Sequence, residues 1–145
     1  MLVVGLGNSD RGDDAAGLLV AQRLSACGIE ALQHTGSMTD LLDIWQNAEQ
    51  VLIVDAIASG GVPGTVHVWN ARTTEFATEI FRSSTHAFGL ADLLKLATTL
   101  ERLPVKVTIY GIEGSQFLFG TPPSVQVLAG VQRTIEEITR LLGRC

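Results

Sequence analysis

The chain has 145 residues, of which 46% are hydrophobic and 17% charged, and its formal net charge is −5. This length predicts a single domain, residues 1–145, that can bury a sizeable core. The negative charge argues against a nucleic-acid partner, which requires clustered Lys and Arg. No apolar run approaches about 18 residues, so no membrane span is predicted. With no charged leader and too few cysteines for a disulfide framework, we expect a cytoplasmic protein.

Hydrophobic periodicity predicts strands and helices in alternation along the chain. Short apolar runs ended by Gly or polar residues predict strands at 2–6, 30–33, 51–54 and 105–110. Apolar residues at helical spacing predict helices at 13–26, from a cap at Ser37 or Thr39 to 46, at 86–100 and at 124–142. Residues 65–69 alternate and predict an antiparallel edge strand. This order predicts an α/β fold with a mostly parallel sheet and helices on both faces.

Polar residues follow the first predicted strand, where an open α/β sheet gathers its site. The segment from Gly5 to Gly17 reads Gly-Leu-Gly-Asn-Ser-Asp-Arg-Gly-Asp-Asp-Ala-Ala-Gly and places Asp13 and Asp14 where a helix should begin. A dinucleotide fingerprint requires Gly where this chain has Asp10. Because the acidic residues would also repel a pyrophosphate, nucleotide binding is not expected.

Three potential metal ligands lie at the ends of predicted strands or at the start of a predicted helix. Asp14 follows the first strand, Asp55 ends the third, and His86 begins the helix before the last strand. Two carboxylates and one imidazole suit a divalent transition metal, and the positive end of a helix dipole would keep His86 neutral. Each residue also has an ordinary structural interpretation, such as a cap for Asp14, and Asp13 is an alternative for that capping role.

Other polar residues near the strand ends are weaker candidates. His34 precedes a turn and is a candidate to support the ligands, whereas His67 is expected to face solvent. Glu113 ends a strand and turn, so it is either a further residue of the cleft or, as the preferred interpretation, a loop carboxylate. The hydroxyl residues with no visible base partner are Ser9, Ser37, Ser59 and Thr85. A hydroxyl nucleophile needs such a partner. A water activated by the metal or by a carboxylate is therefore the expected nucleophile.

The chain resembles the hydrogenase maturation proteases over nearly its full length. The blocks that carry the resemblance are Val4-Gly5-Leu6-Gly7-Asn8, Asp13-Asp14-Ala15-Ala16-Gly17, Leu52-Ile53-Val54-Asp55-Ala56, Gly64-Thr65, His86-Ala87-Phe88-Gly89-Leu90-Ala91-Asp92-Leu93-Leu94, Tyr110-Gly111-Ile112-Glu113, and Gly120 with Pro122-Pro123-Ser124-Val125. Any one block is weak, but the ordered set at compatible spacing is specific. These endopeptidases remove a short C-terminal extension from the large-subunit precursor of nickel–iron hydrogenases.

The resemblance implies a three-layer α/β/α fold, phosphorylase/hydrolase-like, with a mostly parallel five-stranded twisted sheet and one antiparallel edge strand. It implies that Asp14, Asp55 and His86 are both the nickel ligands and the catalytic residues of an aspartyl-type endopeptidase. The nickel is expected to come from the precursor, with other divalent metals substituting in the isolated protein. The expected partner is the large-subunit precursor, with no nucleic acid and no membrane, and the protein is expected to be a monomer.

Two departures from the family pattern bear on function. The first acid is often Glu in the family, and Asp14 is one methylene shorter. The start of the helix must therefore approach the metal more closely, or Asp13 must assist. The loop after the second strand often carries Gly-Gly-Thr, whereas residues 34–37 read His-Thr-Gly-Ser. This difference favours another mode of substrate contact or a different hydrogenase class.

Two other functions are consistent with parts of the sequence. A nickel-dependent chaperone would bind the precursor without cutting it. A peptidyl-tRNA hydrolase also carries a Gly-Leu-Gly-Asn block on a similar fold, but that family continues with Pro-Gly where this chain has Ser9 and Asp10. No His precedes His34, and the net charge is unsuited to tRNA. The protease is therefore the preferred prediction.

Overall fold

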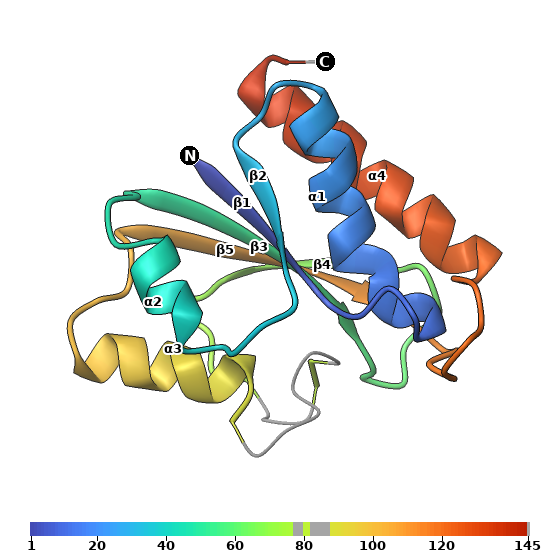
Figure 1. Cartoon of the computed structure of the whole chain (residues 1–145), viewed down its shortest axis with the longest axis horizontal. Coiled ribbons are helices and arrows are strands. Elements are labelled where there is room, and N and C mark those ends of the chain that lie inside the picture. Colours follow the sequence, from blue (N-terminus) through green and yellow to red (C-terminus); the bar gives the residue numbers. More distant parts are fainter. Residues whose placement is uncertain (77–79, 82–87, 145) are drawn as a thin grey trace.

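The computed structural model describes residues 1–76, 80–81 and 88–144. Five strands form one sheet in the order β2-β1-β3-β5-β4. Their bounds are β1 Leu2–Leu6, β2 Ala31–His34, β3 Gln50–Ile57, β4 Val66–Asn70 and β5 Lys106–Glu113. Neighbouring strands are parallel except β4, which pairs antiparallel with β5 at the edge (Figure 1). The predicted sheet, mostly parallel with one antiparallel edge strand, is confirmed.

Helices cover both faces of this sheet and make three layers (Figure 1). Their bounds are η1 Gly12–Ala15 (a 3-10 helix), α1 Ala16–Ala26, α2 Asp40–Ile44, α3 Leu90–Thr99 and α4 Val125–Leu142. α1 and α4 pack against each other on one face, where α1 contacts β1 and β3 and α4 contacts β5. α2 and α3 cover the opposite face. Within the described ranges, no helix combines the length and the apolar character needed to cross a bilayer.

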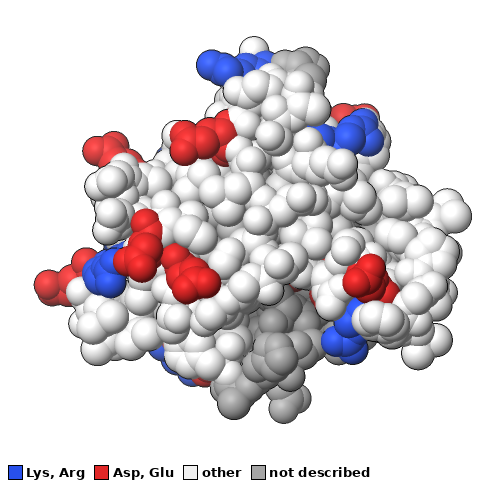
Figure 2. All heavy atoms as spheres, viewed as in Figure 1, with Lys and Arg blue, Asp and Glu red and all other residues white. Residues whose placement is uncertain are grey.

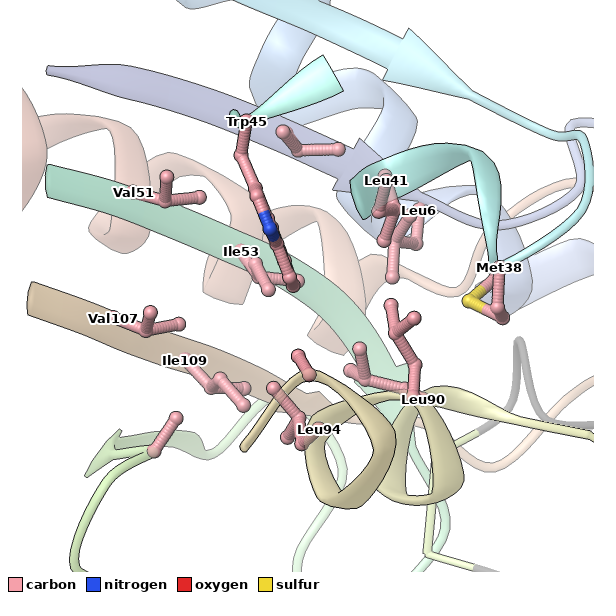
Figure 3. Close-up of a cluster of buried hydrophobic side chains, with 14 of the residues drawn as sticks. Leu6, Met38, Leu41, Trp45, Val51, Ile53, Leu90, Leu94, Val107 and Ile109 are labelled. Carbon is pink, nitrogen blue, oxygen red and sulfur yellow. The ribbon is translucent and has the colours of Figure 1, made fainter. Parts of the chain in front are cut away.

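Residues that alternate along the strands build one hydrophobic cluster on each face. The cluster under α2 and α3 includes Trp45, Ile53, Leu90 and Ile109 (Figure 3). Trp45 is fully buried, and its indole N–H donates to the carbonyl of Arg102 at 3.0 Å. The apolar ring therefore fills the core while its one polar atom remains hydrogen-bonded.

The second cluster lies under α1 and α4. Val54 of β3 belongs to this cluster together with Val131 and Ile135 of α4. Cys27, at the end of α1, packs against it as a partly buried residue. Cys27 is also disulfide-bonded, which the low number of cysteines did not predict.

Glycines bring the main chain of the first helical segment against the sheet. A Cβ added to Gly5 on β1 would collide with the Gly17 carbonyl on α1, and one added to Gly17 would collide with the Val54 carbonyl. Gly7 has a φ of +146°, and a Cβ there would collide with the carbonyl of Asp14. Only glycine allows these close approaches. The segment carrying Asp14 is thus packed directly on the ends of β1 and β3.

α3 begins later than the sequence predicts. The predicted start was His86, but the helix begins at Leu90, after an extended Gly89. The Asp92 carboxylate accepts a hydrogen bond from the Gly89 N–H at 3.1 Å and so caps the helix at this point. His86 is therefore not the first residue of α3, so the helix dipole of α3 does not support the prediction of a neutral His86 imidazole. His86 itself lies outside the described residues.

Candidate active site

Carboxylates gather at the edge of the sheet where the parallel strands end. The buried charged residues in the described part of the chain are Asp13, Asp14, Asp55 and Glu113. Asp13 and Asp14 lie in η1, which contacts β3. Asp55 pairs with Gly111, two residues before Glu113, so the side chains of Asp55 and Glu113 lie on the same face of the sheet. Buried carboxylates are costly, and their concentration marks this edge as the candidate active site.

Asp14 and Asp55 occupy the places that the sequence predicts, at the ends of neighbouring strands. Asp55 is 0% exposed and Asp14 is 4% exposed. Asp55 lies between Ile53 and Ile57, both in the cluster under α2 and α3, so it points to the same face. The Asp14 carbonyl accepts a hydrogen bond from the Asn8 N–H at 3.1 Å, which fixes the main chain of η1 beside the end of β1.

The Asp13 carboxylate accepts hydrogen bonds from backbone N–H groups of the chain. Its Oδ2 accepts hydrogen bonds from the N–H groups of Ser115 and Gln116, both at 2.9 Å. Its Oδ1 accepts one from the Ser124 N–H at 2.6 Å. Burial raises the pKa of Asp13, but the backbone hydrogen bonds from Ser124, Ser115 and Gln116 outweigh it, so the pKa is lowered from 3.8. Asp13 thus has a structural role, but not the capping role considered from the sequence: no side chain in the described part of the chain caps η1, and the Asp13 carboxylate binds the distant loop before α4 instead.

Glu113 and His67 differ from their predicted environments. Glu113 is buried and accepts hydrogen bonds from the Ser59 N–H at 2.8 Å and from the Ser59 hydroxyl. His67 is half-buried, stacks on Trp69 with ring centroids 5.2 Å apart, and places Nε2 3.7 Å from Glu113 Oε1. His67 is therefore less exposed than expected, and Glu113 is the buried last residue of β5 rather than the loop carboxylate that was the preferred interpretation.

The Ser59–Glu113 contact anchors the loop that follows β3. Ser59, expected to lack a partner, contacts a carboxylate rather than an imidazole. This is not the order of a hydrolytic triad, in which the imidazole contacts the serine. A Cβ added to Gly61 would lie 2.9 Å from Glu113 Oε1, so the glycine makes room for the buried acid. The Ser-Gly-Gly run after β3 is the sequence signal that points to this close packing.

His34 and His86 complete the set of predicted residues. The ring of His34 is half-buried, and its Nε2 lies 2.9 Å from the carbonyl oxygen of Ser37, so it closes its own turn. Among the described residues, no three His, Cys, Asp or Glu side chains form a group that could hold a metal ion. His86 is not among those residues, so the set of Asp14, Asp55 and His86 stays a prediction.

Comparison with known proteins supports a peptidase. Residues 33–141 match the family model for hydrogenase maturation protease (HycI). The chain is 31% identical to the NiFe hydrogenase maturation protease HybD from Thermococcus kodakarensis, with a TM-score of 0.79 and 97% of each chain covered. The chain belongs to the hydrogenase maturation protease family.

The fold recurs in other hydrogenase maturation proteases at lower identity. The hydrogenase maturating endopeptidase HybD from E. coli has a TM-score of 0.75 at 23% identity, over 99% of this chain and 93% of that chain. HycI from Thermococcus kodakarensis has a TM-score of 0.74 at 24% identity, over 98% and 91%. Among curated proteins, none matches this chain in sequence. Family membership confirms the predicted enzyme class and favours a protease over a peptidyl-tRNA hydrolase.

Asp13→Asn is expected to lower the free energy of unfolding by about 3 kcal/mol near neutral pH, because a buried amide NH₂ would face backbone N–H donors. The folded-state pKa of Asp13 is lowered, so its contribution is present above the unfolded pKa, near 3.8, and is lost as pH falls through the folded pKa. Urea unfolding at several pH values measures this trend. Asp40→Asn, at an exposed position, is the control. A difference that does not shrink in acid would contradict a charged Asp13.

Proposed function

We propose that this peptidase removes a C-terminal extension from the large-subunit precursor of a nickel–iron hydrogenase after nickel insertion. The observation that carries the proposal is the pair of buried acids, Asp14 and Asp55, at the ends of β1 and β3 in a member of this family. Proteins retain buried carboxylates mainly where a partner or a reaction requires them. The edge of the sheet is therefore the place where the precursor would be positioned.

Asp14, Asp55 and His86 are assigned as ligands for the nickel of the precursor. Two carboxylate oxygens and one imidazole nitrogen form a donor set suited to a divalent transition metal with open positions. The structure supports Asp14 as the acid from the first block, because Asp13 already accepts three backbone hydrogen bonds. Close packing of Gly7 on the Asp14 carbonyl also brings η1 to the strand ends, which suits a side chain shorter than Glu.

The proposed chemistry is hydrolysis of one peptide bond without an acyl-enzyme intermediate. Asp14, Asp55 and His86 hold the metal of the precursor, and with it the scissile bond, at the strand ends. A water molecule attacks the peptide carbonyl carbon, the carbon–nitrogen bond breaks, and the leaving amine takes up a proton. A precursor without nickel lacks the anchor and is left intact. Cleavage would then report that the metal has been inserted.

The test is cleavage of a nickel-loaded large-subunit precursor beside the same precursor without nickel, followed by mass spectrometry. We expect loss of a C-terminal peptide from the nickel-loaded form only. Cleavage of both forms would contradict recognition through nickel while keeping the peptidase activity. Nickel-dependent binding with no loss of mass would contradict the cleavage step and support the chaperone alternative.

A further inference from the structure

An uncharged loop between β5 and α4 presents two adjacent large apolar side chains to solvent. Residues 114–124 contain no Asp, Glu, Lys, Arg or His. Within this loop Leu118 is 70% exposed and Phe119 is 76% exposed. Each such side chain, when exposed, lacks the stabilisation of about 1.5–3 kcal/mol that full burial would give. Single exposed apolar residues are ordinary, but an adjacent pair beside a candidate site indicates an interaction surface.

Hydrogen bonds hold this loop against the segment that precedes Asp14. The Gly12 N–H donates to the Thr121 carbonyl at 3.0 Å, and the Gly120 N–H donates to the Asp10 carbonyl at 2.7 Å. The Asp13 N–H also donates to the Gln116 carbonyl at 2.7 Å, in addition to the bonds that its carboxylate accepts. These bonds lie on both sides of the exposed pair. Leu118 and Phe119 are therefore displayed by a loop that is fixed in place.

The loop borders the proposed active site. The hydrogen bonds join residues 115–121 to residues 10–13, and Asp14 is the next residue in the chain. Figure 1 shows the orange loop before α4 beside the blue segment before α1, at the end of the sheet toward which β5 points. On that side, the surface in Figure 2 is mostly uncharged, with a few separate acidic and basic residues. The loop is therefore fixed beside the segment that carries Asp14.

We propose that Leu118 and Phe119 form a docking surface for an apolar segment of the hydrogenase large-subunit precursor. This inference rests on the proposed function, because it concerns how the same site takes hold of its substrate. The partner segment is apolar because the loop offers no charged group to pair with a charged one. The expected role is to raise affinity for the precursor, whereas the acids hold the metal.

The size of the surface favours a substrate over a second copy of this chain. A large aromatic side chain buries about 150–250 Å². The two side chains therefore supply only a small part of the roughly 1,000 Å² that a stable protein interface requires. A substrate held mainly at the metal needs no more than a small additional contact. The small area and the position beside Asp14 both fit a precursor segment.

The experiment compares the wild type with the double variant Leu118→Ser, Phe119→Ser in cleavage of the nickel-loaded precursor. The double variant is expected to raise KM by about tenfold or more and to leave kcat within about twofold, because uniform binding is lost. Direct binding to the precursor should weaken by a similar factor. Leu141→Ser is the matched control, since Leu141 is 64% exposed near the far end of α4 and should leave both constants unchanged.

The possible outcomes separate this inference from the proposed function. An unchanged KM in a double variant that unfolds like the wild type would overturn the docking surface. If the wild type cuts no precursor, the proposed function fails, and the binding measurement alone decides the docking surface. Size-exclusion chromatography tests whether a second copy of this chain, rather than the precursor, occupies the surface. A wild-type dimer that the double variant converts to a monomer would identify a second copy and overturn the proposal.

Discussion

Asp55→Asn is expected to lower kcat/KM for a nickel-loaded large-subunit precursor by about 100-fold or more. Loss of a residue that merely supports a metal ligand costs about 10–100-fold, so loss of a ligand should cost at least as much. Asn keeps the shape of the side chain at this fully buried position but removes the charge that we propose to bind the metal of the precursor. Initial rates of precursor cleavage, followed by mass spectrometry, measure the effect.

Two comparisons make the Asp55 result specific. Asp43→Asn removes an exposed acid on α2 and should leave the rate unchanged. His86→Ala removes the proposed imidazole ligand and should match the loss in Asp55→Asn. Urea unfolding shows whether each variant is folded before its rate is compared. A folded Asp55→Asn variant with the wild-type rate would refute the ligand assignment.

Asp14→Asn should abolish nickel-dependent cleavage to a similar extent, about 100-fold or more in kcat/KM. The adjacent Asp13 supplies an unusually close control, because the two acids share η1 and differ in what their carboxylates contact. Asp13→Asn loses hydrogen bonds to the loop before α4 and should mainly lose stability. Asp14→Asn should mainly lose activity. Assays at a temperature where both variants are folded measure the two effects separately.

The opposite results would exchange the proposed roles of Asp13 and Asp14. If folded Asp13→Asn lost the activity while Asp14→Asn kept it, Asp13 would be the metal ligand despite its backbone contacts. Asp14→Glu adds a second test, because Glu is common at this position in the family. A rate close to that of the wild type in Asp14→Glu would show that the site tolerates the longer reach. A strong loss would show that the close approach of η1 matches the shorter acid.

Much of the fold follows from local patterns. The strand at Leu2–Leu6 has the predicted bounds because an uninterrupted apolar run ends at Gly7. The edge strand β4 was predicted from simple alternation, and the structure pairs it antiparallel with β5. α3 begins four residues after its predicted start at His86, because the Asp92 carboxylate accepts a hydrogen bond from the Gly89 N–H and caps the helix there. Such choices between nearby caps depend on tertiary packing.

The candidate site was predictable in its location and less so in the role of each residue. Asp14 and Asp55 could be placed at neighbouring strand ends because parallel strands end at one edge. The separate roles of Asp13 and Asp14 depend on N–H groups more than 100 residues away, which no local pattern reveals. The environments of His67 and Glu113 likewise depend on how β4 and the loop after β3 meet β5.

The hydrogen bonds of Asp13 also set the order in which the enzyme can be completed during synthesis. Its partners Ser115, Gln116 and Ser124 follow it by 102, 103 and 111 residues. A nascent chain on the ribosome therefore cannot form these hydrogen bonds of its first acidic turn until the segment after β5 has emerged. The edge that carries Asp14 is among the last parts to close. A truncated translation product would accordingly be unable to present a finished site to a hydrogenase precursor.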